Sequence, residues 1–149
     1  MWGRLYQYSQ SGVRMWEADI TDVPGVSESY WGRLAVSTDG RVYNTDYYNN
    51  QILVYSRDGV YSQSIPTEGR PYGIAIDITN QWLLVGYAWP CSPCNVDLYH
   101  VNGSFIQHVL QMPTNVYSLA MYNNSRLVVG TWRGLYLYNI EAVLLSLTN

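Results

Sequence analysis

The amino-acid sequence predicts an all-β fold made of β-propeller blades, each a sheet of four antiparallel strands. Two observations carry this prediction. A pattern of short strands recurs about every 40 to 45 residues, which is the period of a propeller blade. One strand of the pattern is also apolar on both faces, as a strand buried between stacked sheets would be. Propellers need about four to eight blades to close, and fewer repeats are present here, so we expect a propeller that is incomplete or completed by a partner.

The repeat is clearest where a Tyr ends an apolar run. The segments are LYQYSQSGV (5–13), ILVYSRDGV (52–60), VDLYHVNGS (96–104) and LYLYNIEAV (135–143), and their aligned Tyr residues are spaced 47, 44 and 39 apart. In the first three, a Gly follows that Tyr by four residues, within a Ser-Gly, Asp-Gly or Asn-Gly pair. Such pairs supply the positive φ angles of tight hairpin turns. The fourth segment has Glu141-Ala142 at this place, so no tight turn is predicted there.

A second unit precedes each of the last three Tyr segments. It reads as a strand, a polar turn and a strand in GRLAVSTDGRVYNTD (32–46), YGIAIDITNQWLLVGY (72–87) and YSLAMYNNSRLVVGTW (117–132). Each has a small Ala at the same place, Ala35, Ala75 and Ala120, where we expect elements to approach closely. Together the units predict a half blade at 3–17 and blades at 31–66, 70–112 and 113–149. The last strand of the fourth unit, within EAVLLSLTN (141–149), stays open.

The third strand of the best repeat distinguishes a propeller from other all-β folds. Ile52 and Val54 would point to one face, and Leu53 and Tyr55 to the other. A sheet buried on both faces accounts for this pattern, since a β-sandwich with one solvated face would alternate more cleanly between apolar and polar residues. The β-sandwich is therefore the alternative fold.

Composition excludes several classes of protein. All eight basic residues are Arg, they are spread along the chain, and the formal net charge is −3, so no nucleic-acid partner is expected. No apolar run approaches the roughly 18 residues of a membrane span. The opening MWGRLYQYSQ lacks a charged region followed by an apolar core, so no signal peptide is predicted.

The segment GRVYNTDYYNNQILVYSRDGVY (40–61) resembles the NHL-repeat family of β-propellers. Asp46 matches the acidic residue that ends the family's second strand, and Asn50 matches the Asn before its third strand. RPYGIAID (70–77) looks like the start of the next repeat, and the resemblance extends over about residues 31–138. It implies a propeller fold and says little about function, because such repeats serve many purposes.

Two kinds of propeller enzyme were compared with the residues of this chain. Calcium-dependent lactonases of similar form carry an Asn or Asp between Pro and Gly as a metal ligand, where this chain has Tyr72, and Tyr117 in the next unit. Tyr is a poor ligand for calcium. Propeller-shaped amidating lyases use several His ligands to zinc, whereas this chain has two His. We therefore expect no catalytic residues, no metal and no cofactor, with a propeller hydrolase or lyase as a remote alternative.

The only two cysteines lie in WPCSPCN (89–95). We expect a local disulfide between Cys91 and Cys94, with free thiols or a redox or metal site as alternatives, since no helix is predicted beside them to activate a thiol. Zinc would need His100 and His108 as further ligands. If Asn102 and Gly103 form the centre of a hairpin, however, His108 lies opposite Asp97, and the two His side chains point to opposite faces.

Asn102 and Asn123 each begin an N-glycosylation sequon, and both fall at predicted hairpin turns. Together with the disulfide, they favour an extracellular or secreted glycoprotein, with a cytoplasmic protein as the alternative.

The chain is rich in aromatic residues, with fifteen Tyr and six Trp. Most are expected to pack between blades, and Trp89, Tyr87 and Trp132 are the candidates for a ligand or interface site. The sequence thus predicts a non-catalytic structural or protein-interaction module of an extracellular, self-associating assembly. Its partner would be copies of itself or the rest of a larger propeller, joined through the uncovered end sheets and through segment 141–149. The alternative is a propeller that binds a carbohydrate or peptide.

Overall fold

The computed structural model describes residues 3–26, 32–79 and 81–147, so the predicted unit limits at residues 31 and 149 lie outside the described residues. The chain is almost entirely β-structure, with a short 3-10 helix at Ile20–Asp22 and one α-helix, α1, at Glu141–Leu145. The strands are β1 (Arg4–Tyr8), β2 (Arg14–Asp19), β3 (Leu34–Val36), β4 (Val42–Asp46), β5 (Gln51–Tyr55), β6 (Tyr61–Pro66), β7 (Pro71–Asp77), β8 (Trp82–Tyr87), β9 (Cys94–His100), β10 (Phe105–Met112), β11 (Ser118–Tyr122), β12 (Arg126–Thr131) and β13 (Gly134–Asn139).

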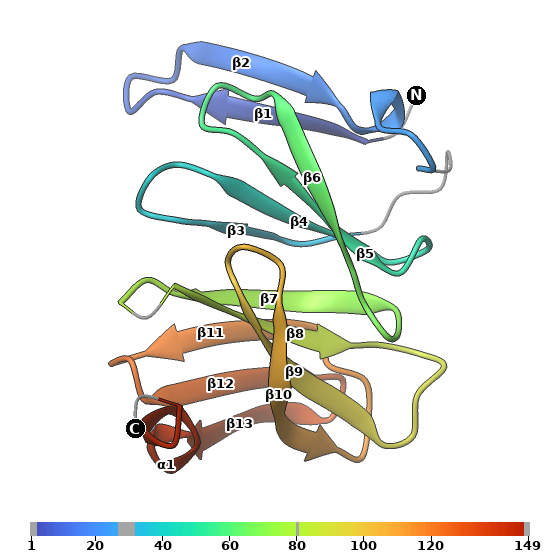
Figure 1. Ribbon diagram of the computed structural model, residues 1–149, viewed down its shortest axis with the longest axis vertical. Coiled ribbons are helices and arrows are strands. Elements are labelled where there is room, and N and C mark those ends of the chain that lie inside the picture. The colour runs from blue at the N-terminus through green and yellow to red at the C-terminus, as the bar shows by residue number, and fades with distance from the viewer. Residues whose placement is uncertain (1–2, 27–31, 80, 148–149) are drawn as a thin grey trace.

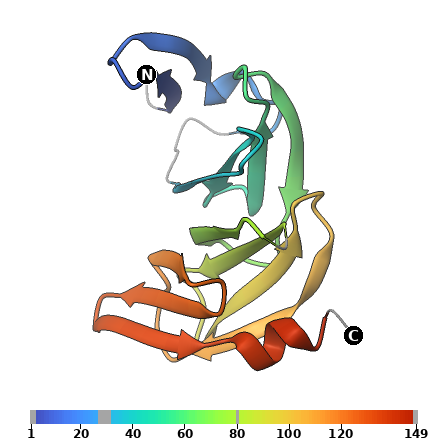
Figure 2. The ribbon, with the colours of Figure 1, turned by 90° about the vertical axis from the view of Figure 1, so that its left-hand side faces the viewer.

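The strands form separate antiparallel sheets that follow one another in chain order (Figure 1). Strands β3–β6 and β7–β10 form four-stranded sheets, β1 and β2 form a two-stranded sheet, and β11–β13 form a three-stranded sheet. Figure 2 shows that the sheets are arranged along an arc, with the two chain ends at its opposite extremes. The predicted all-β fold of four-stranded, blade-like sheets is confirmed, and the alternative β-sandwich is wrong.

The hydrophobic core is divided into clusters between successive sheets. One cluster joins the β1–β2 sheet to the β3–β6 sheet, a second joins β3–β6 to β7–β10, and a third joins β7–β10 to β11–β13 and α1. The middle sheets are therefore covered on both faces, which is why every residue of β8 is buried and why four of the five residues of β5 are. The two-faced apolar pattern of residues 52–55 is explained by this stacking.

The hairpin turns have the conformations that the repeat predicts. Gly12, Gly59 and Gly103 have φ angles of 81°, 79° and 104°, which an L side chain rarely adopts. Asp46, the acidic residue of the NHL-like segment, is fully buried and accepts hydrogen bonds from Asn49 Nδ2 at 2.8 Å and Gln51 Nε2 at 2.9 Å. Asp46 thus organises the turn between β4 and β5.

Residues Glu141–Leu145 form a helix within the segment where a fourth strand or a donated strand was considered. The side chain of Asn139 accepts a hydrogen bond from the backbone N–H of Glu141 at 3.0 Å, which satisfies a free amide at the start of α1. Ile140 and Leu144, four residues apart, are both buried in the core of the last sheet. The segment EAVLL thus stabilises its own chain as α1, and β13 is paired on one side only, with β12.

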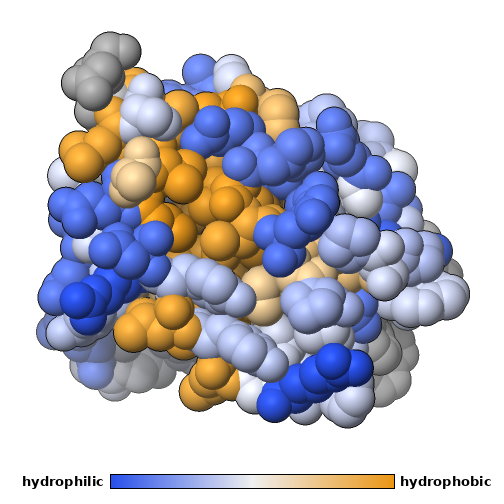
Figure 3. Space-filling view, turned by 90° about the horizontal axis from the view of Figure 1, so that it is seen from below, coloured by the Kyte–Doolittle hydropathy of each residue, from blue (hydrophilic) through white to orange (hydrophobic). Residues whose placement is uncertain are grey.

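The outer face of the terminal sheet is apolar and uncovered. Ala120, Val128 and Leu137 are cross-strand neighbours on β11, β12 and β13, so their side chains share this face. Leu137 is 59% exposed and Leu135, two residues earlier on the same face, is 79% exposed. Figure 3 shows a broad hydrophobic area, rimmed by polar residues, on this side of the molecule. We call Ala120, Tyr122, Val128, Leu135 and Leu137 the outer face.

Candidate ligand-binding face

Three tyrosines, one from each of three successive sheets, form a row. Tyr47 follows β4, Tyr72 lies in β7, and Tyr117 immediately precedes β11. The ring centroids of Tyr47 and Tyr72 are 5.9 Å apart and those of Tyr72 and Tyr117 are 5.6 Å apart, in both cases edge to face. This arrangement is favourable for aromatic rings. Tyr72 and Tyr117, which occupy the positions of the lactonase-type metal ligand, therefore make aromatic contacts instead.

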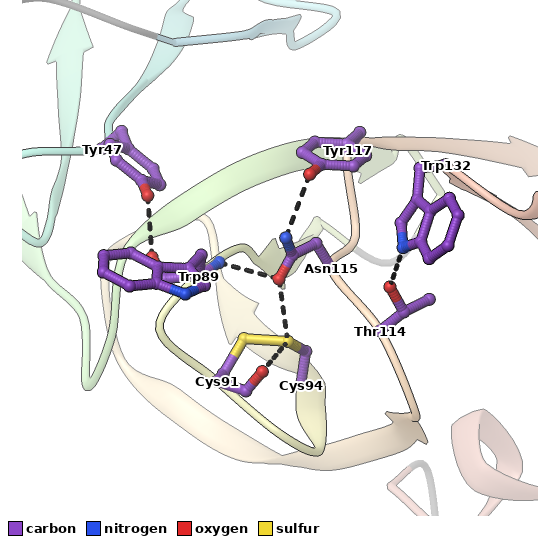
Figure 4. Close-up of a disulfide and its surroundings, with 8 residues drawn as sticks. All are labelled: Tyr47, Trp89, Cys91, Cys94, Thr114, Asn115, Tyr117 and Trp132. Carbon is purple, nitrogen blue, oxygen red and sulfur yellow. Dashed lines mark hydrogen bonds between the residues drawn. A yellow bond between two sulfur atoms is a disulfide. The ribbon is translucent and has the colours of Figure 1, made fainter.

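A chain of hydrogen bonds connects the same three sheets (Figure 4). The Tyr47 hydroxyl donates to the carbonyl of Trp89 at 2.7 Å, and the N–H of Trp89 donates to Asn115 Oδ1 at 2.9 Å. Asn115 Nδ2 then donates to the Tyr117 hydroxyl at 3.0 Å. Because both polar groups of the Trp89 backbone are held, the loop between β8 and β9 has a fixed position.

Two of the predicted aromatic candidates are exposed on the side of the molecule that carries this row. We call the following five residues the aromatic face: Tyr47, Tyr72, Trp89, Tyr117 and Trp132. Trp89 is 62% exposed and Trp132 is 68% exposed. The indole N–H of Trp132 donates to Thr114 Oγ1 at 2.6 Å, which orients the ring while leaving most of it in solvent. Tyr87, the third candidate, is only 5% exposed, and its hydroxyl is hydrogen-bonded to that of Tyr99 at 2.9 Å. Tyr87 therefore packs between sheets and does not contribute to the exposed aromatic surface.

The two cysteines lie beneath Trp89 in the same loop. Cys91 and Cys94 form a disulfide, with their Cα atoms 4.9 Å apart. The Asn115 side chain that holds Trp89 also contacts the buried sulfur of Cys94, with Oδ1 at 3.6 Å from it (Figure 4). The disulfide closes residues 91–94 into a ring that begins two residues after Trp89. In the described part of the chain, no group of three or more His, Cys, Asp or Glu side chains could hold a metal ion.

Three arginines lie over aromatic rings on this face. The guanidinium carbon of Arg33 is 4.8 Å from the Tyr72 ring centroid, and that of Arg133 is 5.0 Å from the Trp132 ring. Arg70 lies 5.2 Å from the Tyr47 ring and 5.8 Å from the Trp89 ring. Within residues 3–26, 32–79 and 81–147, none of the three forms an ion pair with a carboxylate. Their charges are instead partly balanced by the aromatic faces.

A cavity of about 380 Å³ opens beside Trp89, between the β3–β6 and β7–β10 sheets. Its polar lining includes Asn50, Glu68, Arg70 and Asn95, and its apolar wall includes Pro90 and Pro93 of the disulfide loop. We call this space the inter-sheet cavity. Sequence reasoning did not identify it, because residues 50, 68–70 and 87–97 are brought together only by the packing of two sheets.

Asp97 also lines the cavity and is only 1% exposed. As the hairpin argument predicts, it pairs across β9 and β10 with His108, whose Nδ1 donates to Asp97 Oδ1 at 2.6 Å. The second oxygen, Oδ2, is buried and makes no hydrogen bond within the described residues. Burial raises the pKa of the Asp97 carboxyl above its usual value, an effect that the His108 hydrogen bond only partly offsets.

The Asp97–His108 pair lies at the surface end of the cavity wall, with the imidazole partly in solvent. The side chain of His108 is 55% exposed, and its hydrogen bond to Asp97 raises the pKa of the imidazole. Among the residues that the structure describes, no Ser, Thr or Cys side chain is hydrogen-bonded to His108. His100 is hydrogen-bonded instead to the backbone N–H of Asn102, at 3.1 Å from its Nδ1.

The predicted glycosylation positions lie at the opposite end of the sheets. Asn102 is in the β9–β10 turn and Asn123 is in the β11–β12 turn, and both are exposed. In Figure 1 the β11–β12 turn lies on the left and the β9–β10 turn lies near the centre, whereas the β8–β9 and β12–β13 loops of the aromatic face lie on the right. A glycan on either Asn would therefore leave the aromatic face accessible. No helix among the described residues is long and apolar enough to cross a membrane.

Comparison with protein-family models and with curated protein sequences found no match. Solved structures, by contrast, share the fold. The structure of U3-55K matches with a TM-score of 0.66 at 12% identity, over 91% of this chain and 45% of that one. The hydrazine synthase of Kuenenia stuttgartiensis matches with a TM-score of 0.68 at 12% identity, over 89% of this chain and 38% of that one. The chain spans less than half the length of either, and its fold is a partial β-propeller.

Proposed function

We propose that this chain is a non-catalytic β-propeller module, of the NHL-repeat kind, that joins an extracellular self-associating assembly through an uncovered sheet. The observation that carries the proposal is the outer face. Apolar surface of this extent is uncommon on monomeric proteins and is typical of interaction sites. Leu135 and Leu137 are 79% and 59% exposed on β13, which within the described residues is paired only with β12.

The preceding sheet indicates what would cover the outer face. Ala75, Leu84 and Leu98 of β7, β8 and β9 are cross-strand neighbours, like Ala120, Val128 and Leu137 of the terminal sheet. They are 6%, 0% and 0% exposed, because the terminal sheet packs on them. The outer face therefore has the composition of a surface that is normally buried by another sheet. We propose that a second copy of this chain supplies that sheet.

Light scattering on Leu137→Glu tests the proposal. The wild-type chain should associate, with a mass above that of the monomer that increases with concentration, because burying the outer face removes apolar surface from water. Leu137→Glu places a charge in that interface and should give a monomer at every concentration. Val60→Glu is the matched control, since Val60 is 65% exposed in the β5–β6 turn and should not affect the mass. A wild-type chain that stays monomeric up to high concentration would contradict the proposal.

The extracellular location is part of the same proposal. It is supported by the Cys91–Cys94 disulfide, since such bonds persist mainly in oxidising compartments, and by the exposure of both sequon asparagines. The propeller module would then be a glycoprotein with glycans on Asn102 and Asn123, away from the aromatic face.

A second candidate function, ligand binding, is favoured by the aromatic face. Trp89 and Trp132 are exposed, yet hydrogen bonds fix the backbone of the first and the indole of the second. A surface whose aromatic rings are already ordered loses less entropy when it binds. This function is independent of self-association, because the outer face and the aromatic face do not share residues.

A further inference from the structure

We propose that the inter-sheet cavity binds a carbohydrate of one or two sugar rings. The proposal rests on the second candidate function, ligand binding, and gives it a site and a ligand class. At about 380 Å³, the cavity is at the small end of the roughly 300–1,000 Å³ of typical ligand pockets. A ligand larger than a disaccharide would extend over the exposed ring of Trp89.

Four polar side chains that line the cavity have hydrogen-bonding capacity that the protein leaves unused. In the described part of the chain, the side chains of Asn50, Glu68, Arg70 and Asn95 make no hydrogen bond, although all four line the same space. Their planar amide, carboxylate and guanidinium groups offer both donors and acceptors. A sugar, with hydroxyls that each donate and accept, matches such a mixed set.

The buried carboxylate of Asp97 lies at the cavity wall. Asp97 is 99% buried, and its Oδ2 has no hydrogen bond, although a buried acceptor left unpaired costs about 1–3 kcal/mol. The Tyr87 hydroxyl is near enough to lower the pKa of this carboxyl, but it makes no hydrogen bond of normal geometry with Oδ2. A donor entering the cavity beside Asp97, such as a sugar hydroxyl, would relieve this cost.

The charged groups at the cavity balance one another, which favours a neutral ligand. Glu68 and Arg70 line the cavity with opposite charges and form no ion pair with each other, and Asp97 is paired with His108. The charges of the site therefore sum to about zero. A phosphate would meet two carboxylates, and a polyamine would meet the Arg70 guanidinium.

Trp89 provides an aromatic surface beside the opening of the cavity. Trp89 is exposed and its backbone is fixed, and Arg70 lies between the rings of Trp89 and Tyr47. A sugar ring has an apolar C–H face that packs on an indole while its hydroxyls point to polar side chains. The cavity is also lined by Pro90 and Pro93, next to the Cys91–Cys94 disulfide that restrains this loop. The site is therefore formed before a ligand binds.

The test is titration calorimetry with a set of named probes. These are N,N′-diacetylchitobiose, cellobiose, maltose and lactose, with glycine, arginine and inorganic phosphate as non-carbohydrate probes. At least one disaccharide should bind, and Asn95→Ala and Glu68→Gln should each weaken its binding at least tenfold. The control is Gln10→Ala, which also removes an amide, in the exposed β1–β2 turn, and should bind as the wild type does.

Circular dichroism on each variant excludes unfolding as the cause of lost binding. Glu68 is exposed, so Glu68→Gln keeps the test valid should Asn95→Ala fail to fold. The proposal is wrong if no disaccharide binds, or if one binds equally well to both cavity variants. Binding that is weakened only by Trp132→Ala would leave the ligand-binding function standing while removing the cavity as its site. Binding of glycine, arginine or phosphate, lost in the cavity variants, would overturn the carbohydrate class alone.

Discussion

The carboxyl of Asp97 is buried, yet its hydrogen-bond partner, the imidazole of His108, lies at the surface. That combination makes the pair sensitive to pH. The folded state raises the pKa of both groups: burial does so for Asp97 and the carboxylate does so for His108. A group whose pKa is higher in the folded than in the unfolded state contributes stability below its unfolded value, and that contribution is lost as the pH rises through the folded value.

We therefore expect the free energy of unfolding to decrease as the pH rises above about 6.5, the ordinary pKa of His. The change should be below about 1 kcal/mol, since the imidazole is half exposed and screened by solvent. Urea unfolding at a series of pH values measures it. His108→Gln should remove the slope, and His100→Gln, the control, should retain it. A stability that increases with pH over this range would contradict the assignment.

Residue-scale predictions from the sequence were correct where they followed from strand register. The hairpin centred on Asn102 and Gly103 predicts Asp97 as the partner of His108, and the structure has this pair, with register shifts on both sides of it. Sequence could not distinguish buried Tyr87 from exposed Trp89. Tyr87 ends a strand and Trp89 lies two residues further on in a loop, so strand alternation no longer decides where its side chain points.

At the scale of elements, Gly86 marks how closely successive sheets approach. A Cβ on Gly86 would lie 2.2 Å from Cγ1 of Val116, which is fully buried beneath the terminal sheet. Gly86→Ala should therefore destabilise the protein by about 1–3 kcal/mol, the usual cost of overpacking. Gly130 occupies the same place in β12, where a Cβ would meet Ser118 of its own sheet at 3.1 Å.

Gly130→Ala is thus the matched control, and thermal unfolding of both variants makes the comparison. Gly130→Ala should cost clearly less than Gly86→Ala, because the neighbouring Ser118 is exposed and can shift. If the two variants lose equal stability, the cost comes from the backbone conformation of the glycines and not from the close approach of the next sheet.

The elements that sequence placed least well are those at the end of the chain. The strand and turn signals of residues 5–13, 52–60 and 96–104 are local, and the structure has hairpins at all three. Segment 141–149 has no such signal: Glu, Ala and Leu favour a helix, while the repeat favoured a strand. In the structure the segment is a helix, and both Ile140 and Leu144 are buried in the core of the last sheet.

At the scale of the whole molecule, the inter-sheet cavity and the row of tyrosines had no signal in the sequence. Both are made of residues from successive sheets, and no spacing within one repeat reveals which side chains of the next will meet them. The repeat predicts that the sheets stack, but it leaves open which groups face the gap between them. Glu68, for example, lies in the β6–β7 connection and Asn95 in β9, and the two share the cavity only after the sheets have packed.

Stacking along an open arc also predicts an uneven distribution of stability. In β8, each residue is buried and the strand is paired on both sides, whereas β13 is almost wholly exposed and is paired on one side. Local opening requires less free energy where few apolar contacts are lost. Amide hydrogen exchange should therefore be slowest in β8 and β9 and much faster in β1, β2 and β13.

Self-association through the outer face would change this order in one place. At high protein concentration, β13 of the wild-type chain should exchange more slowly, because a second copy covers it, while β8 should be unaffected. In Leu137→Glu, exchange in β13 should not depend on concentration. Mass spectrometry of peptides from both proteins, at two concentrations, measures the difference. If β13 is as protected as β8 in dilute solution, or if concentration slows every strand equally, the open arc is not the form of the chain in solution.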